Sequence, residues 1–212
     1  MHQPNSPPPT AVVAEYTKLA AHYDRRWSRY VEASTAATLA RVTRPSDGCV
    51  LDLGCGTGVL LQKLAHRFPQ AKLVGVDSTA AMLAIAHQRL PPRALLHLAC
   101  AEQLPFADDS FDLVVSSSMF HYLPRPLAAL AEVRRVLKPQ GKLVLSDWCS
   151  DFLTCRVYAH WLRCRNQAHV KTYRTQELHD LLATAGFQFI RVERYRILRL
   201  WGLMTATAVR PV

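Results

Sequence analysis

The stretch Cys49-Val50-Leu51-Asp52-Leu53-Gly54-Cys55-Gly56-Thr57-Gly58 decides the fold. An apolar run typical of a strand leads directly into a loop with glycines at alternate positions, and helical sequence follows at once. Glycine lets the backbone turn tightly and approach a ligand closely. The helix N-terminus behind the loop favours an anionic group such as a carboxylate. The pattern therefore predicts a ligand-binding turn between a strand and a helix.

An acid inside this loop narrows the class of ligand. Asp52 stands two residues before Gly54, where its charge would repel a pyrophosphate but could accept hydrogen bonds from a cationic amine. The loop therefore suits a zwitterionic amino-acid group better than a dinucleotide. A plain tight turn between strand and helix is the alternative interpretation.

A second acid follows the next apolar run. Asp77 ends the run that begins at Leu73 and lies 25 residues after Asp52. Acids at the end of the second strand commonly accept hydrogen bonds from ribose hydroxyls in nucleoside-binding α/β folds. A helix cap is the alternative, but the distance from the glycine-rich loop favours the ribose role.

Strand-like and helical runs alternate outward from this point. The pattern predicts strands over 49–53, 71–76, 94–99, 111–116 and 142–146, helices over 59–67, 80–89 and 127–137, and a turn over 138–141. Such alternation requires parallel strands joined by crossover helices. We therefore expect an α/β fold with a Rossmann-like, doubly wound sheet.

The two ends of the chain do not follow this alternation of strands and helices. We expect a disordered tail over 1–11, a helix over 12–42, and one domain over 12–212. Near the other end, Thr175 is predicted to cap a helix that ends at Gly186. The strand-like runs 187–193 and 198–209 have no helix between them, so they should pair as antiparallel neighbours.

Composition bounds the class of protein. The chain has 212 residues, 50% of them hydrophobic and 20% charged, and carries a net charge of +10. From residue 151 onward, ten Lys and Arg stand against four Asp and Glu. Nucleic acid, an anionic membrane surface or an acidic substrate would each suit this charge. A solvated basic face is favoured because the arginines are spread out.

The six cysteines do not suggest a metal site or disulfides. No Cys-x-x-Cys pair occurs, and the N-terminus has no secretory signal. We expect reduced thiols in a cytoplasmic protein. The spacing of Cys149, Cys155, His160 and Cys164 matches no usual zinc pattern, so no metal is expected.

Taken together, four stretches resemble the class I methyltransferases that use S-adenosylmethionine, in particular the UbiE-like and "methyltransferase 11" group of small-molecule enzymes. These stretches are Asp52 to Gly58, Asp77, residues 101–112 and residues 132–142. The resemblance implies a seven-stranded sheet of order 3-2-1-4-5-7-6 with strand 7 antiparallel. It also implies S-adenosylmethionine as cofactor and S-adenosylhomocysteine as product.

The resemblance further implies which residues hold the cofactor. Asp52 and the glycines would hold the methionine part, Asp77 the ribose, and Ala101 with Glu102 the adenine edge. The full set of expected cofactor-binding residues is Tyr23, Asp52, Gly54, Cys55, Gly56, Gly58, Asp77, Ser78, Cys100, Ala101, Glu102, Ser116 and Met119. Similar proteins often have an acid at the position of Cys100, so one adenine contact is expected to be weaker here.

Methyl transfer needs alignment and exclusion of water more than it needs a catalytic group. A general base is required only when the acceptor is protonated. His121, in the loop after the fourth strand, is our candidate base, and a packing role is its alternative. Asp147, at the end of the fifth strand, could orient or deprotonate the acceptor or merely cap a turn.

Two segments are candidates for covering the site. Related enzymes often have a Tyr-Asp pair in an N-terminal helix that closes over the cofactor, so residues 12–44 with Tyr23 and Asp24 are expected to form a lid. For Trp27 we favour core packing. Residues 151–173 lie where this fold varies its substrate cover, and their arginines could suit an anionic or membrane-embedded amphiphile.

We therefore expect methylation of a small molecule at oxygen, nitrogen or a ring carbon, with a quinol-like or amphiphilic metabolite among the candidates. The alternatives are RNA methylation and a non-catalytic, cofactor-binding partner subunit. Nucleic acid is not the favoured partner, because no RNA-binding module and no Asn-Pro-Pro-Tyr-like motif is found. Peripheral membrane contact and either a monomer or a homodimer are compatible with the sequence.

Overall fold

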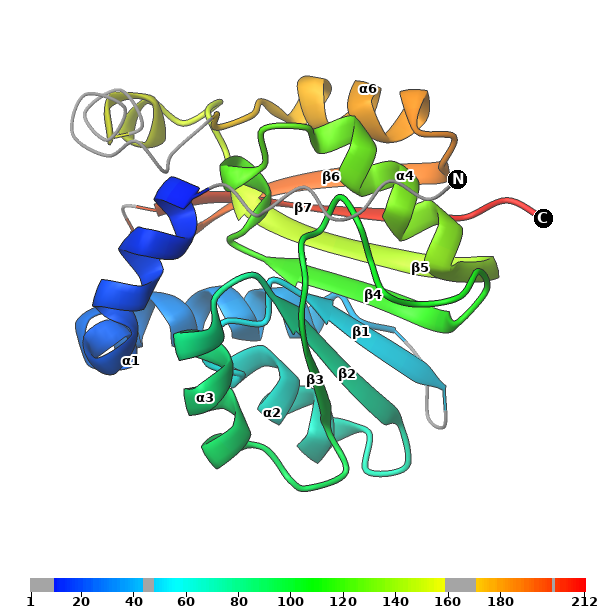
Figure 1. The fold of residues 1–212 in the computed structure, drawn as a ribbon. Helices are drawn as coiled ribbons and strands as arrows, with labels where there is room; N and C mark the ends of the chain where they lie inside the picture. Colours follow the sequence, from blue (N-terminus) through cyan, green and yellow to red (C-terminus); the bar gives the residue numbers. More distant parts are fainter. Residues whose placement is uncertain (1–9, 44–47, 159–170, 200) are drawn as a thin grey trace.

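The chain folds around one mixed sheet with helices on both faces (Figure 1). The computed structural model describes residues 10–43, 48–158, 171–199 and 201–212. The strands are β1 (Cys49–Leu53), β2 (Lys72–Asp77), β3 (Leu95–Leu98), β4 (Phe111–Ser117), β5 (Leu137–Trp148), β6 (Gln188–Ile197) and β7 (Trp201–Val209). Their order is β3-β2-β1-β4-β5-β7-β6, and β7 runs antiparallel to both of its neighbours. The predicted fold class and strand order are confirmed.

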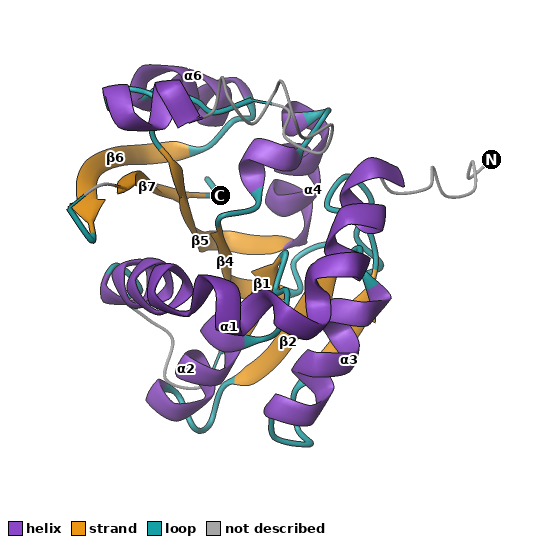
Figure 2. Cartoon of the chain, turned by 90° about the vertical axis from the view of Figure 1, so that its left-hand side faces the viewer, coloured by secondary structure: helices purple, strands orange, loops and turns teal. Residues whose placement is uncertain are grey.

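The helices form two layers around the sheet (Figure 2). They are α1 (Thr10–Ala40), α2 (Val59–Arg67), α3 (Ala80–Arg89), the short 3-10 helix η1 (Phe120–Tyr122), α4 (Pro126–Val136) and α6 (Thr175–Thr184), and residues 153–158 are also helical. Helices α1, α2 and α3 cover one face, and α4 and α6 cover the other. Among the described residues, no helix is long and apolar enough to cross a membrane.

The central strands are buried on both faces, which explains their nearly continuous apolar sequence. Successive residues of β1 point to opposite sides, so that Val50 packs with α2 and Leu51 packs with α4. Neighbouring strands repeat this alternation, as Leu113 joins Val50 and Val114 joins Leu51. The sheet therefore separates two cores, and its carboxyl-end edge stays available for loops.

A third, aromatic cluster fixes α1 to the far half of the sheet. Tyr30 of α1 packs with Trp148 at the end of β5 and with Leu203 of β7. Trp27, one helical turn earlier, lies edge-on to Trp201 with ring centroids 6.4 Å apart. The expected packing role of Trp27 is what the structure shows.

Two details of the secondary structure differ from expectation because tertiary pairing overrides local sequence signals. The predicted turn at 138–141 lies within the bounds of β5 as an irregular segment, where the register with β4 shifts and Gln140 has a φ angle of 63°. There the backbone amide of Gln140 and the carbonyl of Gly141 pair with Arg210. Thr175 is the first residue of α6 and not its N-cap, which is Arg174. The Thr175 hydroxyl instead donates to Asp151 at 2.7 Å.

The N-terminal helix starts earlier than expected, since α1 begins at Thr10 and not at residue 12. The expected tail, residues 1–11, therefore overlaps the helix at residues 10 and 11. The rest of that expectation, over residues 1–9, lies outside the described residues.

Burial of Leu51 yields a stability prediction. Leu51 is fully buried at the centre of β1, so Leu51→Ala should lower the free energy of unfolding by about 2–5 kcal/mol through lost apolar burial and a cavity. Leu98→Ala on edge strand β3 is the matched control, because Leu98 is 61% exposed, and its effect should stay within about 0.5 kcal/mol. Urea denaturation measures both, and equal losses would contradict the assigned core.

Candidate functional site

One cavity, partly open to solvent, lies at the carboxyl ends of β1, β2 and β4. Sites for small molecules in α/β sheets form at this edge. Nine of the expected cofactor-binding residues line the cavity: Tyr23, Gly54, Gly56, Asp77, Ser78, Cys100, Ala101, Glu102 and Met119.

The glycine loop, residues 54–58, forms the floor of this cavity. Gly54 and Gly56 have φ angles of 73° and 53°, in the left-handed region that glycine adopts without steric cost. A Cβ at Gly54 would lie 2.4 Å from the Met119 side chain, whereas one at Gly56 would meet nothing within 4 Å. The loop is therefore packed tightly at Gly54 and opens into free space at Gly56.

Asp52 is a buried acid directly behind this loop. Its side chain is 1% exposed, and its Oδ2 atom has no hydrogen-bond partner among the described residues. Burial, and secondly the charge of Asp77, raise the pKa of Asp52 to about 8. A buried carboxylate is costly unless a cation or donor compensates it. The site therefore suits a ligand that brings a positive charge close to the loop, although Asp52 does not itself line the cavity.

Asp77 joins the loop to the second strand. Its carboxylate accepts hydrogen bonds from the amide of Gly56 at 2.9 Å and from the amide of Thr79 at 2.8 Å. The same carboxylate lines the cavity, where it can accept from hydroxyls of a ligand. Burial raises the pKa of Asp77, and the amide hydrogen bonds oppose that rise.

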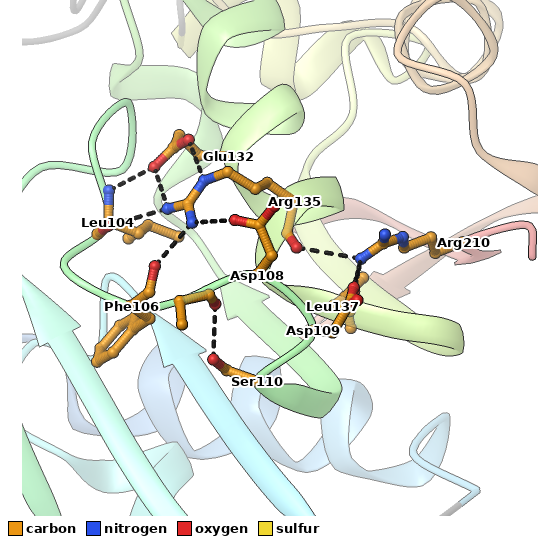
Figure 3. A network of polar contacts seen from close by, with 10 residues as sticks. Leu104, Phe106, Asp108, Asp109, Ser110, Glu132, Arg135, Leu137 and Arg210 are labelled. Atoms are coloured by element: carbon orange, nitrogen blue, oxygen red, sulfur yellow. Dashed lines mark hydrogen bonds and ion pairs between the residues drawn. The ribbon is translucent and has the colours of Figure 1, made fainter. Parts of the chain in front are cut away.

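A network of polar contacts fixes the segment that follows the Cys100–Glu102 edge (Figure 3). The Arg135 guanidinium of α4 donates to the carbonyls of Leu104 and Phe106 at 3.0 and 2.7 Å, and it pairs with Glu132. Glu132 in turn accepts from the amide of Leu104 at 2.7 Å. The network ties the segment after Glu102 to α4.

Helix α1 supplies the wall opposite the loop. Tyr16 and Tyr23 line the cavity, and burial raises the pKa of Tyr23 to about 12, so its phenol stays protonated. The neighbouring Asp24 accepts from the Thr57 hydroxyl at 2.7 Å and pairs with Arg89 of α3 at 2.5 Å. Of the expected Tyr-Asp pair, Tyr23 thus faces the site, and Asp24 binds α1 to the glycine loop.

His121 and Asp147 form a buried pair behind the cavity. Their Nδ1 and Oδ1 atoms lie 2.6 Å apart, and the His121 backbone amide donates to Oδ2 at 2.8 Å. The His121 ring stacks on Trp148 with centroids 4.9 Å apart. Both side chains are at most 2% exposed, and neither lines the cavity. Their expected catalytic role stays a prediction.

Three other expected contact residues also lie outside the lining. Cys55 and Gly58 belong to the loop but face away from the cavity, and the Ser116 hydroxyl donates to the Leu53 carbonyl at 2.9 Å. Among the described residues, no group of three metal-binding side chains occurs. His160 and Cys164 lie outside the described residues.

Several lining residues were not expected from the sequence, among them Ser117, Ser118 and Tyr122. Ser117 ends β4, Ser118 follows it, and the serine run at the end of an apolar strand was a usable signal for these two. Tyr122 accepts a hydrogen bond from Tyr16 at 2.7 Å across the cavity. That pairing spans 106 residues, and no local pattern reveals it.

Comparisons with known proteins agree with this geometry. The family model "Methyltransferase domain" matches residues 51–145. Demethylmenaquinone methyltransferase of Lactiplantibacillus plantarum is 31% identical over 186 residues, covering 74% of this chain and 78% of that protein. Ubiquinone/menaquinone biosynthesis C-methyltransferase UbiE of Desulfotalea psychrophila is 35% identical over 125 residues, covering 58% of this chain and 48% of that protein.

A solved structure supports the fold alone. The methyltransferase in a complex with the Haloferax volcanii Trm112 methyltransferase activator superposes with a TM-score of 0.84 at 21% identity, covering 93% of this chain and 98% of that chain. The chain spans about half the length of several curated relatives that it matches.

The raised pKa of Asp52 predicts how stability depends on pH. A carboxyl whose pKa rises from 3.8 to about 8 on folding stabilises the protein at low pH, and this contribution is lost as pH rises through 8. Asp52→Asn should therefore gain melting temperature over the wild type, increasingly so between pH 5 and 8. Thermal unfolding without ligand measures this, with exposed Asp180→Asn as control. A constant difference between variant and wild type would refute the burial argument.

Proposed function

The chain belongs to the S-adenosylmethionine-dependent methyltransferases of the UbiE-like type, and on this premise we propose that it transfers the cofactor's methyl group to a small-molecule acceptor. The observation that carries the proposal is the convergence of the glycine loop, Asp77 and residues 100–102 on one cavity. A bound nucleoside with an amino-acid tail requires these three parts. Along the chain they follow the order of the amino-acid tail, the ribose and the adenine.

The residues fit this cofactor at both polar ends. The open space at Gly56 and the buried Asp52 oxygen, which has no hydrogen-bond partner among the described residues, suit an ammonium group and its carboxylate beside the loop. Asp77 borders the same cavity, where it can accept from the ribose hydroxyls. At the adenine end, Cys100 and Ala101 line the cavity, and Glu102 supplies the one carboxylate there.

The bound cofactor supplies a methyl group already activated by the sulfonium charge. The protein then has to align the acceptor with that methyl and to exclude water. Tyr16, Tyr23 and Tyr122 provide an aromatic wall for this purpose, and electron-rich ring faces favour a neighbouring cation. Ties between α1 and the loop through Asp24 keep this wall in place.

Among small-molecule acceptors we favour a quinol-like one, because the tyrosine wall suits an aromatic ring. Two similar proteins are named for ubiquinone or menaquinone biosynthesis and for demethylmenaquinone, whereas others are named for malonyl-acyl-carrier protein and trans-aconitate. RNA methylation has no such support, and intact Asp52 and Asp77 speak against a non-catalytic subunit. Screening of metabolite extracts for products heavier by one methylene unit would test the acceptor class.

We assign His121 and Asp147 a positioning role in this scheme. Asp147 holds η1 in place through its contacts with the backbone amide and the ring of His121. Helix η1 in turn presents Tyr122 to the cavity. A direct base role for His121 would require its ring to reach the acceptor. The ring does not line the cavity: it stacks on Trp148 and lies behind Tyr122, with the His121 and Tyr122 ring centroids 4.0 Å apart.

Binding of S-adenosylhomocysteine tests the cofactor assignment. Asp77→Asn should weaken its affinity roughly 10- to 100-fold, because a hydrogen bond to a charged group contributes about 1.5–3 kcal/mol. Titration calorimetry measures the effect, and exposed Asp180→Asn should leave the affinity unchanged. Equal affinity of wild type and Asp77→Asn would sink the ribose assignment, and absence of binding to the wild type would sink the proposed function.

A second substitution separates positioning from base catalysis. His121→Asn retains an N–H that can donate to Asp147 but removes the imidazole. We expect it to keep turnover of the screened acceptor within about tenfold, whereas a base contributes typically 10²–10⁴-fold. The kcat–pH profile should keep its shape. Loss of a hundredfold or more, with unchanged S-adenosylhomocysteine affinity, would reinstate His121 as base.

A further inference from the structure

A chain of hydrogen bonds leads from the core to the cavity through three elements. The Trp148 indole at the end of β5 donates to the Tyr30 hydroxyl of α1 at 2.6 Å. The Tyr30 hydroxyl lies 2.7 Å from the Ser118 hydroxyl, which follows β4 and lines the cavity. Trp148 and Tyr30 are 7% and 8% exposed, so water does not compete for the inner bonds.

The chemistry of the groups fixes the direction of this chain. An indole N–H can only donate, so Tyr30 accepts at its inner side. Among the described residues, the acceptor within reach of the Tyr30 proton is Ser118, and an unused buried donor would be costly. Burial raises the pKa of Tyr30 well above its ordinary value, so the phenol keeps the proton that it donates. Ser118 therefore accepts from Tyr30.

The proton of Ser118 is then directed outward. No acceptor in the described part of the chain receives it, and the side chain borders the cavity. Ser118 also has a φ angle of 58°, a left-handed conformation that is unusual for serine and that concentrates at functional sites. The Ser118 amide holds this conformation by donating to the Ser146 carbonyl at 2.9 Å.

We propose that Ser118 is a fixed hydrogen-bond donor for an oxygen atom of a molecule bound in the cavity. The inference rests on the proposed function and specifies the ligand chemistry of that site. A carboxylate, carbonyl or phenolate oxygen satisfies such a donor, and an ammonium group does not. Two sources of that oxygen exist, the carboxylate of the cofactor and an oxygen of the methyl acceptor.

Ser118→Ala and Tyr30→Phe test the donor and its orientation. If the oxygen belongs to the cofactor, both variants weaken S-adenosylhomocysteine binding roughly three- to tenfold in titration calorimetry. If it belongs to the acceptor, that affinity changes less than twofold. Benzoate binding, measured with and without saturating S-adenosylhomocysteine, then falls in both variants, whereas benzylamine binding does not.

Tyr195→Phe is the matched control, because it removes a hydroxyl that lies 2.7 Å from Thr205 and does not line the cavity. Its affinities should equal those of the wild type, and thermal unfolding of each variant confirms that it is folded. Unchanged binding of both S-adenosylhomocysteine and benzoate in Ser118→Ala overturns the proposal. So does a loss in Ser118→Ala that Tyr30→Phe does not share. Failure of the wild type to bind S-adenosylhomocysteine counts against the proposed function. The benzoate measurements without S-adenosylhomocysteine still show whether Ser118 is a hydrogen-bond donor.

Discussion

The hydrogen bonds that cross from the glycine loop to β2 set the geometry on which the cavity depends. The amides of Gly54 and Cys55 donate to the Val76 carbonyl at 2.8 and 2.9 Å, and the Gly56 amide donates to the Asp77 carboxylate. These bonds fold the loop back over the ends of two strands. They also place one acid behind the loop and one beside it, which is the charge pattern for a ligand with a cationic tail and a ribose.

Helix α1 completes the site by contacts that are distant in sequence. It reaches the glycine loop through Asp24 and the end of β4 through Tyr30, and its clustered aromatics anchor it on β5 and β7. The sheet alone would leave the cavity open along this side. Because the same helix contacts both the glycine loop and the segment after β4, its position links these two parts of the cavity lining.

Local sequence signals were sufficient for the sheet and for the floor of the cavity. Alternating apolar runs predicted a doubly wound sheet, and the glycine spacing with Asp52 predicted the loop, because both depend on neighbouring residues. The strand order came from the family resemblance and not from the runs themselves. Local signals placed an irregular segment at 138–141 but not its pairing with Arg210, and they did not predict the bond of Thr175 to Asp151. They also could not reveal Ser118 as a donor, since its orientation depends on Tyr30, which lies 88 residues away.

Transfer of a methyl group from a cofactor bound at this loop to a small molecule can be measured directly. The measurement is mass spectrometry of a metabolite extract incubated with the protein and with S-adenosylmethionine that carries a deuterated methyl group. We expect a deuterated-methyl product and an equimolar amount of S-adenosylhomocysteine. Cofactor binding without any labelled product, across extracts that include aromatic quinol-type metabolites, would contradict it.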